Sequence, residues 1–134
     1  MIERFADAFF FLALGNPKDP AHARSKSYLP SLARDRIVTT AWVLTEVADA
    51  LASPKNRPAF ARLLTMLEKR NAVIIEPTAE LFNQGIGLYL RRPDKSWSLT
   101  DCISFVVMAD RGLTEALTGD RHFEQAGFKP LLLV

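Results

Sequence analysis

Four acidic residues lie at or near the ends of segments expected to be buried, where a charge is costly. They are Asp7, Glu46, Asp101 and Asp120. Asp7, for example, interrupts the apolar run at residues 5–11, and an ionised carboxylate without a partner is expensive to bury. Two carboxylates roughly 4 Å apart repel by about 4 kcal/mol at an effective dielectric constant of about 20. A cluster of these acids would therefore need a cation, and all-oxygen ligation favours Mg²⁺ or Mn²⁺.

Each acid also has a purely structural interpretation. Asp7, Asp101 and Asp120 stand where helices are expected to begin, and an aspartate there accepts backbone N–H groups. Ser98 precedes Asp101 by three residues, which resembles a capping box. Glu46 fits an exposed position at the edge of an apolar helix stripe. Only the convergence of all four acids would favour a metal site over these local roles.

Short apolar runs alternate with longer segments of helical periodicity, a pattern typical of a parallel α/β sheet. Strands are expected at residues 2–6, 36–39, 73–76, 115–118 and 130–134. Helices are expected at residues 8–14, 20–34, 41–52, 57–70, 79–91, 100–111 and 121–126. Sites in such sheets form outside the carboxyl ends of the strands. Asp7 and Asp120 follow strands directly, Glu46 lies early in a helix after another, and Asp101 begins the helix that leads to the fourth. These positions allow the four acids to meet.

Composition limits the class of protein. The 134 residues are expected to form one domain, and a net charge of +2 argues against a polyanion-coating tail. An apolar fraction of 49% argues against disorder. The single cysteine, Cys102, permits no intrachain disulfide and no cysteine-based zinc site, so we expect a reducing, cytoplasmic location. The apolar run at residues 8–14 is too short to span a membrane, and we expect no membrane association.

Four motifs carry a resemblance to a known family. They are Asp7 in Phe-Ala-Asp, Glu46 in Thr-Glu-Val, the block at residues 94–105 that contains Asp101, and the segment at residues 117–123 that contains Asp120. The whole chain resembles PIN-domain ribonucleases, specifically the VapC-type toxin of type II VapBC toxin–antitoxin systems. The resemblance implies a single PIN domain over residues 1–134. Its fold would be a three-layer α/β/α, Rossmann-like arrangement around a parallel sheet of about five strands. One departure is Phe9, where the family usually has a small hydroxyl or amide residue.

The resemblance also implies an activity. Asp7, Glu46, Asp101 and Asp120 would be the catalytic metal ligands of a Mg²⁺- or Mn²⁺-dependent endoribonuclease, which leaves a 5′-phosphate and a 3′-hydroxyl. Ser98 and Thr118 are candidates for hydroxyls that orient these carboxylates, although both also suit backbone capping. The implied partners are an RNA substrate, a VapB-like antitoxin and a second copy of the chain in a homodimer.

Two further groups of residues are candidates for binding. Arg91, Arg92 and Lys95 precede the Ser98–Asp101 pair and would guide the RNA backbone, unless they form only a solvated loop. If a metal neutralises the four acids, the rest of the chain contains 17 basic and 11 acidic residues, a balance that favours binding of phosphates. The segment at residues 53–70 is amphipathic, and its apolar stripe is either core or an antitoxin groove. The stripe consists of Phe60, Leu63, Leu64 and Leu67.

Three other functions would share part of this sequence pattern. A phospho-receiver domain lacks support because the segment at residues 73–77 offers no aspartate at the third strand. A metal-free ribonuclease would need paired acid–base groups, usually histidines, and the chain has only His22 and His122. His122 is close to Asp120 and would either line the RNA path or occupy an exposed helix position. The third rival is a catalytically silent PIN-like protein-binding module, against which the presence of all four acids argues.

Overall fold

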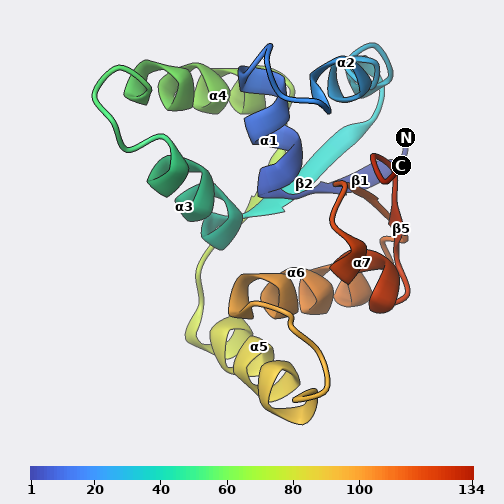
Figure 1. Ribbon diagram of the computed structural model, residues 1–134. Coiled ribbons are helices and arrows are strands. Elements are labelled where there is room, and N and C mark those ends of the chain that lie inside the picture. Colours follow the sequence, from blue (N-terminus) through green and yellow to red (C-terminus); the bar gives the residue numbers. More distant parts are fainter.

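Five parallel strands form the central sheet of the computed structural model, which describes residues 1–134 (Figure 1). Their order is β3-β2-β1-β4-β5, so the chain builds outward from β1 in one direction and then in the other. The point between β1 and β4, where the order reverses, is where open α/β sheets form their binding crevices. The strands are β1 (Glu3–Ala6), β2 (Arg36–Thr40), β3 (Val73–Ile75), β4 (Glu115–Leu117) and β5 (Lys129–Pro130).

Helices cover both faces of the sheet. In Figure 1, α1, α2 and α4 lie on one side of β1 and β2, and α5, α6 and α7 lie on the other. This three-layer α/β/α arrangement confirms the predicted fold class. None of the helices is both long and apolar enough to cross a membrane. The helices are α1 (Ala8–Gly15), α2 (His22–Lys26), the 3₁₀ turn η1 (Ser31–Ala33), α3 (Ala41–Ala50), α4 (Arg57–Lys69), α5 (Ala79–Arg91), α6 (Leu99–Asp110) and α7 (Arg121–Gln125).

Two predicted elements are wrong in extent. The helix expected at residues 20–34 is split into α2 and η1, because Pro30 lacks a backbone N–H and disfavours a helical residue before it. The strand expected at residues 130–134 is only the two-residue β5. After β5 the chain turns, although the Leu132 amide still donates to the Thr118 carbonyl at 3.0 Å.

Aromatic side chains join the site-bearing helices to the sheet. The Phe123 ring of α7 lies 6.1 Å from Phe5 of β1 and 5.0 Å from Phe105 of α6, measured between ring centroids. Trp97 is buried edge-on against Phe105 at 5.1 Å. Such pairs add about 0.5–1.5 kcal/mol each beyond the apolar area they bury. The positions of α6 and α7 relative to β1 are therefore fixed by packing rather than by the polar site.

Charges at the amino ends of the strands are paired across the sheet. Arg4 of β1 donates to Asp35, just before β2, at 2.9 Å and to Glu115 of β4 at 3.2 Å. The hydrogen bond from the Ile2 amide and the Arg4 guanidinium hold the pKa of Asp35 below its ordinary value. These contacts link the three central strands at the end of the sheet opposite to Asp7.

Candidate metal centre

Asp7 is the first residue after β1, and its side chain is only 7% exposed. It stands at the N-cap position of α1, but its carboxylate makes no capping hydrogen bond there. Instead, the hydroxyl of the fully buried Thr118 donates to Asp7 Oδ2 at 2.9 Å. Since Thr118 directly follows β4, this bond joins the carboxyl ends of two neighbouring strands at the point where the strand order reverses.

Burial raises the pKa of Asp7 from 3.8 to about 6, although the hydrogen bond from Thr118 opposes the rise. Repulsion from Asp101 and Asp120 raises the pKa further. The ionised form of Asp7 is therefore disfavoured by its surroundings. A cation bound at the carboxylate would remove that penalty.

Asp101 is held in the first turn of α6 by a capping box. The Asp101 amide donates to Ser98 Oγ at 3.0 Å, and the Ser98 amide donates to Asp101 Oδ2 at 3.1 Å. The backbone of Ser98 therefore orients the Asp101 carboxylate, and the Ser98 hydroxyl is occupied by the Asp101 amide. The carboxylate that completes this helix cap is the same one that faces His122, and it is 12% exposed.

His122 bridges the two aspartates that begin α6 and α7. Its Nδ1 lies 2.9 Å from Asp101 Oδ2 and 3.5 Å from Asp120 Oδ1. Asp120 Oδ1 also accepts the His122 amide at 2.9 Å, which caps α7. One donor atom from each of the three side chains lies within 4.8 Å of the others. Sequence reasoning placed His122 only on an RNA path or at an exposed position, because nothing local shows that its ring turns toward Asp101.

Glu46 approaches the group from α3. Partial desolvation raises its pKa from 4.5 to about 7, and repulsion from Asp7, Asp101 and Asp120 adds to the rise. The side chain retains contact with solvent, so it can respond to a bound ion more easily than Asp7 can. Asp7 and Glu46 are thus close enough to be repelled by Asp101 and Asp120. They are not part of the tight group formed by Asp101, Asp120 and His122, whose donor atoms lie within 4.8 Å of one another.

No lysine or arginine forms an ion pair with any of the four acids, and His122 is their only basic partner within 4 Å. Elsewhere on the protein, acids such as Asp35 and Asp94 are paired with arginines. The carboxylate oxygens that dominate this donor set suit a hard divalent ion such as Mg²⁺ or Mn²⁺. The residues present therefore fit the metal that the sequence implied.

Phe9 lies beside this centre. Its ring packs on Gly119, the residue before Asp120, so closely that a Cβ added to Gly119 would come within 2.5 Å of the ring. The ring remains partly exposed at 36%. Gly119 therefore leaves room for the unusual Phe9, and Thr118, just after the neighbouring strand β4, supplies a hydroxyl to Asp7.

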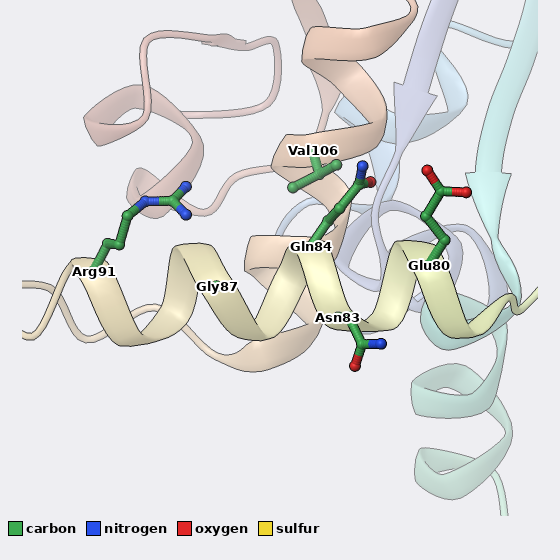
Figure 2. A pocket seen from close by; sticks show the side chains of 6 residues that line it. All are labelled: Glu80, Asn83, Gln84, Gly87, Arg91 and Val106. Carbon is green, nitrogen blue, oxygen red and sulfur yellow. The ribbon is translucent and has the colours of Figure 1, made fainter.

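The three basic candidates for RNA binding differ in their surroundings. Arg92 donates two hydrogen bonds to Asp94, each 3.0 Å long, and its guanidinium lies over Trp97. Arg91 borders an open polar hollow of about 550 Å³ on α5. Figure 2 shows Glu80, Gln84 and Arg91 along the same side of α5, while Asn83 points away from them. Lys95 is half-buried in the loop that follows α5.

A groove of about 1120 Å³ lies among α1, α2, α3 and α4. Of the four residues predicted for a groove, only Leu63 lines it. Leu67 is fully buried in the core, Leu64 is 41% exposed outside the groove, and Phe60 packs against the core. Of the predicted stripe, α4 presents only Leu63 to this groove, because it uses its apolar side mainly for core packing and contributes one edge of a groove formed by four helices.

The sequence pattern of the PIN domain family matches residues 5–129. The chain is 27% identical over 129 residues to the 23S rRNA-specific endonuclease VapC20 of Mycobacterium tuberculosis, a match that covers 92% of this chain and 94% of the relative. The crystal structure of VapC20, described as a Sarcin-Ricin loop cleaving toxin, superposes with a TM-score of 0.82 over 92% of this chain and 95% of that one.

Two more distant structures share the fold. VapBC2 from Rickettsia felis, solved with a DNA fragment from its promoter, has a TM-score of 0.70 at 15% identity and covers 96% of both chains. PAE2754 from Pyrobaculum aerophilum has a TM-score of 0.61 at 17% identity, with 97% of this chain and 90% of that one covered.

The buried charge of Asp7 predicts a stability effect that depends on pH. A carboxyl with a raised pKa destabilises the folded state increasingly as pH rises from its unfolded pKa to its folded pKa. In the metal-free protein, Asp7→Asn should therefore raise the free energy of unfolding at pH 8 by roughly 2–3 kcal/mol and change it little near pH 4. Urea denaturation in EDTA across this range measures the difference.

Asp110→Asn, at an exposed carboxylate at the end of α6, is the matched control and should change stability little at any pH. A metal-free Asp7→Asn variant that is less stable than the unaltered protein at pH 8 would contradict the electrostatic interpretation.

Proposed function

Because the chain belongs to the PIN domain family, we propose that it is a Mg²⁺- or Mn²⁺-dependent endoribonuclease and the toxin of a VapBC-type toxin–antitoxin pair. The observation that carries the proposal is the group of acids at the ends of β1 and β4, which no lysine or arginine neutralises. The similarity to the endonuclease VapC20 over 92% of the chain supports the same activity.

Asp7, Glu46, Asp101 and Asp120 would hold the metal. When bound, a divalent ion supplies positive charge for the phosphate and lowers the pKa of attacking water. The protein's own contribution is orientation: Thr118 fixes the buried oxygen of Asp7, and the capping box fixes Asp101. The carboxylates are thereby placed before substrate arrives.

RNA would approach over α5 and the loop that follows it. Arg91 is exposed beside the polar hollow of Figure 2, and we assign it and Lys95 to contacts with phosphates. Arg92 has a different role, since its bonds to Asp94 and its stacking on Trp97 anchor the loop. Trp97 is itself buried and donates to Gln125 at 3.0 Å, so it offers no surface for a base to stack on.

Cleavage of RNA should depend on the acids and on metal. Asp101→Asn removes a charged ligand and should lower the rate at least about 100-fold, and EDTA should abolish activity. A synthetic sarcin–ricin loop RNA is the first substrate to test, because VapC20 is described as cleaving that loop. Gel analysis with end labelling would report the rate and a 5′-phosphate product.

The control is Asp110→Asn, which leaves all four candidate ligands in place and should cleave at the normal rate. Cleavage that continues unchanged in EDTA would refute metal dependence. A metal-loaded protein that cuts neither this loop nor any other cellular RNA would refute the nuclease assignment.

The antitoxin would bind in the groove among α1, α2, α3 and α4. Its lining includes apolar side chains such as Leu12, Val47 and Met66. The lining also has many basic side chains and the single acid Asp19, so the matching segment would be an amphipathic helix with an acidic polar face. The basic lining residues are Lys18, Lys26, Lys55, Arg62 and Arg70, together with His22.

Substitutions in the groove should release the antitoxin. Arg62→Glu reverses an exposed charge, and Leu63→Asp places a charge on the apolar wall, so each should weaken binding at least about tenfold. Copurification with the product of the adjacent gene, followed by calorimetry, measures the loss. Leu64→Asp, one residue outside the groove, is the matched control and should bind normally.

Circular dichroism establishes that each variant is folded. If both groove variants are folded and bind the antitoxin as tightly as the control, the partner occupies another surface.

We also expect a homodimer. Large apolar side chains are exposed on β3 and α5 and do not line the groove, and exposed apolar surface of this kind commonly marks protein interfaces. Phe82 of α5 stacks on Trp42 of α3 with an interplanar angle of 4°, which extends the apolar surface to α3. The exposed residues are Ile74, Phe82, Tyr89 and Leu90.

Charge introduced on α5 should dissociate the dimer. Tyr89→Glu and Leu90→Glu alter side chains that are 48% and 68% exposed, so they should raise the dimer dissociation constant at least about tenfold without unfolding the chain. Light scattering after gel filtration would then report a mass near the 15.0 kDa of one chain. Leu64→Glu, on α4, should leave the dimer intact. A monomeric unaltered protein at high concentration would contradict the expectation.

A further inference from the structure

His122 occupies the centre of the metal site rather than its margin. Its Nδ1 is 2.9 Å from Asp101 Oδ2 and 3.5 Å from Asp120 Oδ1, and its side chain is 30% exposed. The ring comes from the first turn of α7, whose start is fixed by the bond between the His122 amide and Asp120. The imidazole nitrogen therefore faces both aspartates without any rearrangement of the backbone.

The spacing of these atoms suits shared coordination. Adjacent ligands of a six-coordinate ion, each about 2.1–2.2 Å from the metal, lie about 3 Å from one another. The distance from His122 Nδ1 to Asp101 Oδ2, 2.9 Å, matches that value, and the distance to Asp120 Oδ1, 3.5 Å, is somewhat longer. Asp7 is differently placed, because one of its oxygens already accepts the Thr118 hydroxyl and it lies outside the tight group.

We propose that His122 is a nitrogen ligand of the catalytic metal and makes this centre prefer Mn²⁺ to Mg²⁺. The proposal rests on the nuclease function proposed above and deepens it. Mg²⁺ strongly favours oxygen ligands, whereas Mn²⁺ accepts imidazole nitrogen as well and lies above Mg²⁺ in affinity for mixed N/O sites. The imidazole would strengthen this preference beyond what the four carboxylates give. A neutral imidazole adds a ligand without adding to the negative charge of the cluster.

Pulsed electron paramagnetic resonance of the Mn²⁺-loaded protein provides a direct test, because a coordinated imidazole nitrogen modulates the electron spin echo. The chain contains only two histidines, so a directly bound imidazole is His22 or His122. His22 lies in α2, where its Nδ1 contacts the Ala13 carbonyl at 2.7 Å. The His22→Gln variant is therefore the matched control.

The nitrogen modulation should be present in the unaltered protein and in His22→Gln, and absent in His122→Gln. In calorimetric titrations, His122→Gln should weaken Mn²⁺ binding about tenfold or more and change Mg²⁺ binding less than about threefold. Circular dichroism would establish that the variants are folded.

Different failures identify different errors. If the unaltered protein binds Mn²⁺ and cleaves RNA but shows no imidazole modulation, His122 is not a ligand and the nuclease function stands. Equal weakening of Mg²⁺ and Mn²⁺ by His122→Gln would likewise overturn the proposal, since His122 would then only position Asp101. A protein that binds neither ion would overturn the proposed function and the ligand assignment together.

Discussion

The arrangement depends on negative charge gathered at one end of the sheet without arginine or lysine to neutralise it. At the amino ends of the strands, Arg4 pairs with Asp35 and Glu115, and the pKa of Asp35 is lowered. At the carboxyl ends, the pKa values of Asp7 and Glu46 are raised instead. The same small sheet thus holds acids in opposite electrostatic environments. The paired end links the strands, whereas ionisation of the acids at the unpaired end is disfavoured, and a bound cation would offset that penalty.

The strand order explains why the acids meet. β1 lies between β2 and β4, so side chains that follow β1 and β4 are neighbours although more than a hundred residues separate them. The hydrogen bond from Thr118 to Asp7 is the direct contact across that boundary. The α6 and α7 helices then bring Asp101 and Asp120 to the same place, and the packing of Phe105 and Phe123 on the core determines where those helices begin. Apolar packing therefore positions the polar site.

Much of this arrangement could be predicted because it follows from local patterns. Alternating strands and helices gave the layer order, and the four acids could be named from their places beside those elements. Asp101 and Asp120 lie at helix caps as predicted, because each carboxylate accepts a capping amide, and both carboxylates also face His122.

What could not be predicted depends on distant contacts. His122 turns toward Asp101 only because α7 packs beside α6, and the sequence alone does not give that angle. Leu67 belongs to the same helical stripe as Leu63, yet one is fully buried and the other lines a groove, because α1, α2 and α3 decide which part of α4 stays accessible. The periodicity of a helix identifies its apolar side but not the elements that cover it.

Phe9 illustrates how a departure from a family pattern can be absorbed. A bulky ring two residues after Asp7 supplies no hydroxyl to the carboxylate, but Thr118 supplies one from the neighbouring strand. The ring also needs space, and Gly119 provides it between Thr118 and Asp120. Three consecutive residues therefore have three different roles. Thr118 donates its hydroxyl to Asp7, Gly119 leaves space for the Phe9 ring, and Asp120 caps α7. Because these roles fall on consecutive residues, Phe9 and Gly119 form one structural unit with the candidate metal centre, and a side chain at Gly119 would displace the Phe9 ring.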